Sequence, residues 1–472
     1  MYAKWDEQPD QELIQRHERE IFPLMKRRHL FSEVRNFLLY DFFTPEGDVN
    51  ENVFAYSNRS GDERALVIYH NKYDSARGWV RSSVAYSIRK GKGEERTLIQ
   101  KDLADGLGLH DDQAYFCIFR DNATGLEYIR NSQELCKKGL YVELGAYQYH
   151  VFIDFREVRD NQWHHYAQIA HALNGRGVPG LEEVFKEMLL RPFQDAFKEL
   201  VDADMFRRLL EARITQPQGQ LDQKLMEEIE KKMIDLLREV KQLSGGREDE
   251  VIIAREVRRK LEAILYLPII TSRYPQLQPK GVKAAAEYLY KGLTDSISTW
   301  ATLFSWLFVH VLGKATHPRG FAEQSRSWME EWRLERTISD VLKKLGSDET
   351  TTWRTVTLVK LLTRHQRWFE AKPLVQTQAH AILESLFKDR EVKQFLGVNQ
   401  YDDIWWFNKE AFEEMLWWLI MVAALTIGSD PLRPVNAVVE ELQGCYSTIL
   451  KWHEAEKKSQ YQVEKLLSTL QE

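Results

Sequence analysis

The feature that most constrains the fold is a change of sequence pattern near residue 156. Between residues 53 and 155 the chain consists of short runs rich in β-branched and aromatic residues, and turn-forming residues separate these runs. About seven strands within about a hundred residues are typical of a small antiparallel β-sandwich. The runs predict strands over residues 53–57, 65–70, 80–88, 115–120, 126–129, 140–144 and 150–155.

After Arg156 the pattern becomes helical and remains so to the end of the chain. Its clearest part is 221–243, where apolar residues recur at spacings of three and four. Polar breaks at 215–219 and 244–246 bracket this segment. Its apolar face covers only about three heptads, so we expect an antiparallel helical hairpin rather than a long coiled coil.

The N-terminal part also has helical spacing. Apolar residues over 10–44 predict one or two helices, which end at the Pro and Gly of 44–48. We therefore predict an α+β multidomain chain in which an antiparallel β-sandwich precedes a large all-α domain. The expected divisions are a helical segment at 1–52, the sandwich at 53–158 and the helical domain at 159–472, with a further split near 215–250.

Composition excludes several classes of protein. Hydrophobic residues make up 43% of the chain and charged residues 29%, which is ordinary for a globular protein. A net charge of −6 without a basic stripe argues against a nucleic-acid-binding protein. Three scattered cysteines predict neither a disulfide framework nor a zinc site, and they favour a reducing, cytoplasmic location. The apolar runs 300–312 and 415–427 fall short of the ~20 residues of a membrane span, so we expect buried helices.

Three segments in the first third of the chain carry a family resemblance. HEREIFPLMKRRHLF (17–31), VFAYSNRSGDERALVIYHN (53–71) and GLYVELGAYQYHVFIDF (139–155) occur in that order. Together they resemble the last barrel helix, the opening hairpin and the closing strand pair of the β-sandwich in the α-amylase superfamily of glycoside hydrolases. The resemblance covers residues 12 to 155.

The resemblance implies a part of an enzyme rather than its catalytic centre. In that family the sandwich follows a catalytic barrel, whose chemistry uses two carboxylates that flank a glycosidic bond. Residues 1–52 contain none of the acidic barrel motifs, so no catalytic residue is carried over. We expect a non-catalytic C-terminal part that stabilises an upstream barrel domain and positions an α-glucan. The alternative is a free-standing scaffold that binds glycan or protein.

Without its barrel, such a chain should expose apolar side chains. The residues expected to lose packing partners in the helical segment 1–52 are Phe22, Leu24, Leu30, Phe31 and Phe37.

Trp79, Tyr86 and Tyr147 are the candidate carbohydrate-binding residues. Flat apolar faces of glucose pack on aromatic rings, although aromatic residues in strands more often belong to a core. We predict no metal ligands and no cofactor. His171 lies six or seven residues after His165 and His164, a spacing that does not place ligands on one helix face.

Other polar groups suit ordinary structural roles better than chemistry. The adjacent acidic pairs Asp111–Asp112 and Glu94–Glu95 are expected to be solvated in loops. The glycine-rich segment 174–180 lacks the context of a phosphate loop and is expected to be a linker. A third hypothesis is an enzyme site in the helical domain, among His310, His317, His365 and the tryptophans near residues 300–332. No spacing of a nucleophile and a base supports it.

Overall fold

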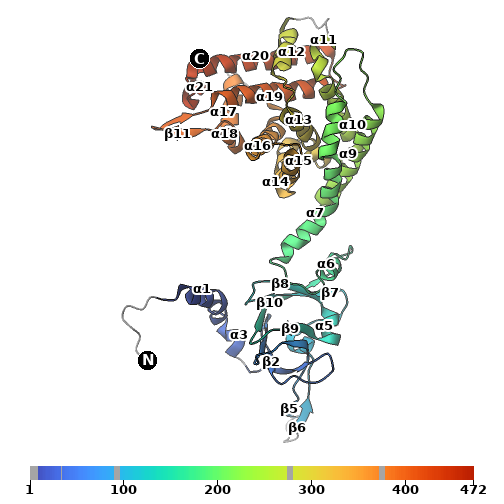
Figure 1. Cartoon of the computed structure of the whole chain (residues 1–472), viewed down its shortest axis with the longest axis vertical. Helices are drawn as coiled ribbons and strands as arrows, with labels where there is room; N and C mark the ends of the chain where they lie inside the picture. The colour runs from blue at the N-terminus through green and yellow to red at the C-terminus, as the bar shows by residue number, and fades with distance from the viewer. Residues whose placement is uncertain (1–8, 33, 90–95, 274–279, 371–377, 472) are drawn as a thin grey trace. The chain divides into compact units, whose positions relative to one another are not determined.

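The computed structural model describes residues 9–471 except 33, 90–95, 274–279 and 371–377. The chain forms two compact units, Met1–Leu189 and Leu190–Glu472, and their division falls within helix α7 (Leu181–Leu200). The first unit contains the strands of the main sheet, and the second is almost entirely helical (Figure 1). The fold is therefore α+β. The acidic pair Glu94–Glu95 lies outside the described residues.

One antiparallel eight-stranded sheet forms the centre of the first unit, in the order β8-β7-β10-β3-β2-β1-β4-β9. A separate two-stranded sheet joins β5 to β6. The strands are β1 (Leu38–Phe43), β2 (Val53–Ser60), β3 (Glu63–His70), β4 (Ala76–Ser83), β5 (Tyr86–Arg89), β6 (Arg96–Ile99), β7 (Tyr115–Asp121), β8 (Glu127–Asn131), β9 (Leu140–Leu144) and β10 (Tyr149–Arg159).

Most of the predicted strands are confirmed, with two corrections. The run predicted as one strand over 80–88 is two, because β4 ends at Ser83 and β5 begins at Tyr86. The helix predicted to reach residue 44 ends earlier, since Leu38–Phe43 forms β1 between β2 and β4. In β1 every second residue is buried, namely Leu38, Tyr40 and Phe42. This two-residue period is that of a strand with one face against the core.

The sheet curls, so that strands far apart in its order share one core. A single buried cluster contains Phe119 of β7, Phe152 of β10, Val80 of β4 and Leu140 of β9. Bulges in the β7–β10 and β1–β4 pairings allow the strands to bend. The helices of this unit are α1 (Gln11–Glu20), α2 (Phe22–Met25), α3 (Arg28–Ser32), α4 (Leu103–Leu107), α5 (Ser132–Lys138) and α6 (His165–Leu173).

The N-terminal helices cover the outer face of β3 and β10. Leu30 is 1% exposed and packs with Ala65 and Val151. The expectation that Leu30 would be exposed is therefore wrong, because the sheet's second apolar face covers it. Leu24 and Phe31 are partly buried in the same cluster, whereas Phe22 and Phe37 are exposed, as expected.

The second unit is a helical bundle with one small hairpin of β11 (Asn399–Tyr401) and β12 (Ile404–Trp406). Its main helices after α7 are α8 (Ala203–Glu211), α9 (Gln223–Ser244), α10 (Glu250–Leu265), α11 (Ile270–Arg273), α12 (Lys280–Gly292), α13 (Ile297–Val309), α14 (Phe321–Glu331), α15 (Leu334–Lys344), α16 (Glu349–His365), α17 (Gln378–Lys388), α18 (Arg390–Phe395), α19 (Lys409–Gly428), α20 (Val435–Ser459) and α21 (Val463–Thr469).

The predicted helical hairpin is confirmed as α9 and α10, which pack against each other. Asp222 and Asp249 cap their N-termini by accepting hydrogen bonds from backbone N–H groups. Gly245 ends α9 with a positive φ of 70°, a conformation that glycine adopts without strain.

The apolar run 300–312 begins in α13 and extends past its end, and the run 415–427 lies in α19; most side chains of both helices are buried. By length and composition, α19 is the one described helix that could cross a membrane, and 72% of its most apolar window is buried in the unit. The helix pair Val282–Gly292 and Ile297–Ala315, bent by 118°, could count as a second span.

Candidate functional site

A groove of about 1630 Å³ lies at the two edges of the curled sheet. The edge strands β8 and β9 both line it, and α5, which joins them in sequence, lines it as well. Asn131 caps the start of α5 by accepting a hydrogen bond from the Glu134 N–H at 3.2 Å. Gly139 ends α5 with a φ of 76°, and a Cβ at this position would lie 2.2 Å from the Val80 carbonyl oxygen. The turn back into β9 therefore requires glycine.

An aromatic pair forms one wall of the groove. Trp79 of β4 and Tyr141 of β9 are direct cross-strand partners, and their ring centroids are 4.9 Å apart. Trp79 is half-buried and Tyr141 is 38% exposed. The Tyr141 hydroxyl donates to Glu143 Oε1 at 2.8 Å, and this hydrogen bond raises the pKa of Tyr141. The pair is thus a fixed, partly exposed aromatic surface beside a carboxylate.

Polar groups of both signs line the rest of the groove. Lys138 pairs with Glu134 at 3.0 Å. Arg130 donates to the backbone oxygens of Ile129 and Gly175, and burial lowers its pKa. Among the described strands β9 pairs only with β4, so its outer edge also offers backbone donors and acceptors. The groove therefore suits a polar ligand without a large net charge.

A histidine–aspartate pair adjoins the groove. His150 lines it and its Nδ1 is 2.9 Å from Asp121 Oδ2. Burial alone would raise the pKa of Asp121, but the hydrogen bond and the charge of His150 lower it overall. Asp121 also accepts from the Val151 N–H and the Thr124 hydroxyl, so it fixes the turn between β7 and β8. The pair orders the backbone behind the groove.

The three predicted carbohydrate-binding residues occupy different places. Trp79 lines the groove. Tyr147 is 54% exposed in the turn before β10, where its ring lies 6.3 Å from that of Tyr73. Tyr86 lies on β5 and packs against the buried cluster of the main sheet. Tyr141 was not among the predicted residues, because only the β4–β9 register shows that it faces Trp79.

The remaining motifs of this unit have structural partners. His164 lies 3.7 Å from Asp160, and His165 Nδ1 lies 2.9 Å from the Asn161 amide nitrogen. Asp112 accepts a hydrogen bond from the Ala114 N–H. The segment 174–180 precedes α7, and its Val178 pairs with Glu127 of β8 as an isolated bridge.

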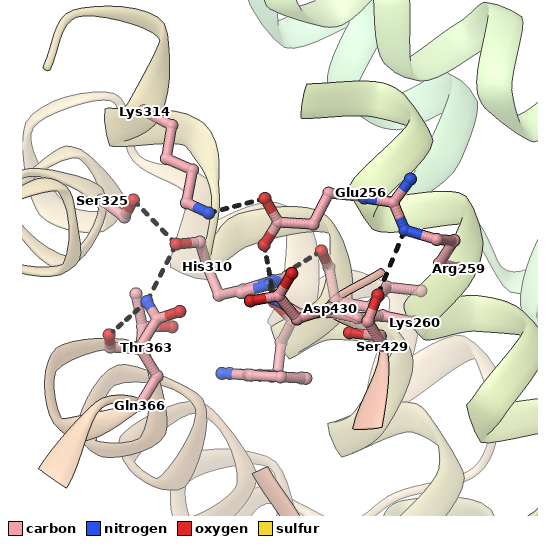
Figure 2. Close-up of polar contacts among 12 residues, drawn as sticks. Glu256, Arg259, Lys260, His310, Lys314, Ser325, Thr363, Gln366, Ser429 and Asp430 are labelled. Carbon is pink, nitrogen blue, oxygen red and sulfur yellow. Dashed lines mark hydrogen bonds and ion pairs between the residues drawn. The ribbon is translucent and has the colours of Figure 1, made fainter. Parts of the chain in front are cut away.

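A second candidate lies inside the helical unit, around Lys260 (Figure 2). This lysine of α10 is 2% exposed, and its ammonium group donates to Glu256 Oε1 at 2.8 Å and to His310 Nε2 at 2.7 Å. His310 Nδ1 is 2.9 Å from the Leu307 carbonyl oxygen, so Nδ1 carries the proton and Nε2 accepts from lysine. Lys314 donates to the other Glu256 oxygen at 2.6 Å.

The charges of this cluster respond to burial. Burial lowers the pKa of Lys260 to about 8, although Glu256 opposes the change. Burial and the neighbouring Lys260 lower the pKa of His310 well below its usual range, so this histidine is neutral. For Glu256 burial acts to raise the pKa, but Lys260 and Lys314 outweigh it and hold the pKa far below its usual value.

The cluster joins several helices. Ser325 of α14 and Gln366 after α16 both donate to the His310 carbonyl oxygen, at 3.1 and 2.9 Å, as Figure 2 shows. These bonds satisfy a carbonyl that the end of α13 leaves without a helical partner. The cluster therefore holds α10, α13, α14 and α16 in register.

A cavity of about 380 Å³ adjoins the cluster and is lined by Glu256, Arg259, Lys314 and Arg433. Its cations already have partners: Arg433 pairs with Asp430 at 3.0 Å, and Arg259 donates to the Ser429 carbonyl oxygen at 3.1 Å. A lysine that forms an imine must reach its substrate. Lys260 is buried and does not line the cavity, so the cluster is suited to structural support.

The histidines of the third hypothesis do not form one site. His310 bonds Lys260, whereas His365 Nε2 is 2.7 Å from Asp389 Oδ2. The hydrogen bond from His365 helps to hold the pKa of Asp389 far below its usual value against the effect of burial. His310 and His365 therefore belong to separate hydrogen-bond groups. For His317 the described residues give only a backbone bond, from its N–H to the Gly313 carbonyl oxygen at 3.3 Å.

Comparison with known proteins adds no relative: no protein-family model, no curated protein and no solved structure matches this chain.

Proposed function

We propose that the first unit is the non-catalytic β-domain of an α-amylase-type enzyme and that its groove holds an α-glucan chain. The observation that carries the proposal is the Trp79–Tyr141 pair within a groove of about 1630 Å³. A pyranose ring presents a flat C–H face to an aromatic ring and hydroxyl groups around its rim. The groove offers both kinds of partner side by side.

The size and charge of the groove favour a neutral oligomer. Pockets for single small molecules measure roughly 300–1,000 Å³, and this groove is larger. Cations such as Lys138 have carboxylate neighbours such as Glu134, so the groove attracts neither strong anions nor strong cations. Glucan hydroxyls donate and accept hydrogen bonds with both groups and with the free edge of β9.

The N-terminal helices support the enzyme part of the proposal. Their inner side is anchored, because the Tyr149 hydroxyl donates to Glu20 Oε2 at 2.6 Å and Asn122 donates to the Glu20 carbonyl oxygen at 2.7 Å. Five large apolar side chains of this segment are nonetheless exposed: Leu13, Ile14, Ile21, Phe22 and Met25. Exposed apolar groups on a fixed support are typical of a docking face.

The proposed occupant of this face is a catalytic barrel. The curled sheet would then act as the β-sandwich that covers the barrel's last helix. The reaction would be retaining hydrolysis or transfer at α-glucosidic bonds, with both carboxylates supplied by the barrel. Residues 1–472 alone should therefore bind glucan without cleaving it.

Isothermal titration calorimetry with maltoheptaose tests the proposal. The full chain should bind in a saturable manner, and Trp79→Ala should weaken binding by at least about tenfold, which corresponds to loss of ~1.4 kcal/mol of stacking. Trp353→Ala is the matched control, since Trp353 is 51% exposed in the other unit. Equal affinity of wild type and Trp79→Ala would place any glucan site elsewhere.

A further inference from the structure

The most informative polar group that no proposal above uses lies between α12, α19 and α20. It consists of Glu413 near the start of α19 and of His453 and Glu456 near the end of α20. One potential ligand atom from each residue lies within 4.8 Å of those of the other two. Helices α19 and α20 pack against each other, and α12 contacts both, so three packed elements fix the group (Figure 1).

Glu456 has a buried carboxylate oxygen without a hydrogen-bond partner in the described part of the chain. Its side chain is 1% exposed, and the oxygen concerned is Oε1. A buried carboxylate with a free oxygen is unfavourable unless a cation compensates it.

His453 is oriented by a second residue. Its Nε2 is 3.0 Å from the Tyr288 hydroxyl, and its Nδ1 is 3.4 Å from Glu456 Oε2. In the tautomer whose Nε2–H donates to the Tyr288 oxygen, the Nδ1 lone pair faces the Glu456 carboxylate. A metal-binding histidine is commonly held in this way by its other nitrogen.

We propose that Glu413, His453 and Glu456 bind a divalent transition-metal ion. One imidazole nitrogen and two carboxylate oxygens suit Zn²⁺, Mn²⁺ or Fe²⁺ better than Mg²⁺ or Ca²⁺, which prefer oxygen alone. Glu413 is 44% exposed, which gives the ion access from solvent and leaves a coordination position for water. Lys409 Nζ lies 3.8 Å from Glu413 Oε1 on that rim.

The opposing interpretation is a simple ion pair in which a protonated His453 lies between two carboxylates. It predicts no specific affinity for metal ions. The site does not share residues with the groove of the first unit, so a negative result for metal binding would leave the glucan proposal unchanged.

Calorimetric titration of Zn²⁺ into the chelator-treated full chain tests the site. We expect one ion per chain, and a loss of affinity of at least about 100-fold in His453→Ala and Glu456→Gln, because removing even a supporting residue costs 10–100-fold. Glu454→Gln, on the exposed side of the same helix, is the matched control and should bind as wild type does. Glu413→Gln alters a half-exposed side chain, so it tests the site even where the buried substitutions impair folding.

Co²⁺ provides a second readout through its visible absorption. Bands of nitrogen and oxygen ligation that disappear in Glu413→Gln and His453→Ala would support the site. Absence of stoichiometric Zn²⁺ binding, retention of wild-type affinity in Glu413→Gln and His453→Ala, or a thiolate charge-transfer band from any of the three cysteines would overturn it.

Discussion

Replacing Lys260 by methionine should change how the stability of the helical unit depends on pH. The pKa of Lys260 is about 8 in the folded chain, and its ordinary value is 10.5. Because the folded value is the lower one, the unfolded chain binds the proton more strongly over this interval. Below pH 8 the buried, charged lysine destabilises the folded chain by a constant amount. As the pH rises from 8 to 10.5 this destabilisation progressively disappears.

The size of this effect follows from the two pKa values. One pKa unit corresponds to ~1.4 kcal/mol, so the contribution amounts to about 3 kcal/mol. Methionine has a similar volume and no proton, and Glu256 keeps its bond to Lys314 in the variant. His310 Nε2 loses its donor, which costs about 1–3 kcal/mol at every pH. At pH 7 the buried charge in the wild type and the lost hydrogen bond in the variant destabilise by similar amounts, so the two proteins should be nearly equal in stability. At pH 10.5 only the lost hydrogen bond remains, and the wild type should be more stable by about 1–3 kcal/mol.

Urea denaturation followed by far-ultraviolet circular dichroism, at several pH values from 7 to 10.5, measures the difference. Titrations of other groups occur in both proteins and cancel. Lys231→Met, at an exposed position on α9, is the control and should give a difference that stays constant with pH. A constant difference for Lys260→Met as well would refute the conclusion that burial destabilises the Lys260 charge.

Three further variants test other parts of the structure. Gly139→Ala should destabilise the first unit by about 1–3 kcal/mol in thermal denaturation, because residue 139 has a φ of 76° and a ψ of −167° that only glycine tolerates. An unchanged melting temperature would contradict the geometry of the β9 turn. Replacing both Phe22 and Met25 by serine should reduce self-association and binding of the dye ANS, because both side chains are exposed. The free energy of unfolding should change by less than about 0.5 kcal/mol. Dye binding equal to that of the wild type would show that these side chains are covered. Glu456→Gln should raise the melting temperature of the metal-free chain at pH 7. Burial raises the pKa of the Glu456 carboxyl, so its ionised form opposes folding. A lower melting temperature would show that the charge is compensated.

Most strands could be predicted because the signals that mark them, alternating apolar residues and flanking turn residues, lie within a few residues of each other. The alternation along 151–155 and the turn residues at 58–62 appear in β10 and in the β2–β3 hairpin. The sequence predicts a helix through residues 38–43 because LLYDFF follows a segment with helical spacing, and a short apolar run fits both periods. Pairing with β2 and β4, which the sequence does not display, decided the outcome.

The candidate sites depended on long-range contacts. Tyr141 meets Trp79 only through the β4–β9 register, and Lys260 meets His310 across fifty positions of sequence. A signal was nevertheless present. Lys260 falls on the buried face of α10, three residues after Val257, and Glu456 falls on the buried face of α20, four residues after Trp452. A charged residue within an apolar stripe indicates a buried polar partner, although it does not identify that partner.

The most direct test of the central claim is one maltoheptaose titration of the purified full chain in which reducing ends are also assayed. The account predicts saturable binding that Trp79→Ala weakens, with no increase in reducing ends. Failure to bind maltoheptaose at millimolar concentration, or cleavage of the oligosaccharide by this chain, would contradict the assignment of a non-catalytic α-glucan-binding domain.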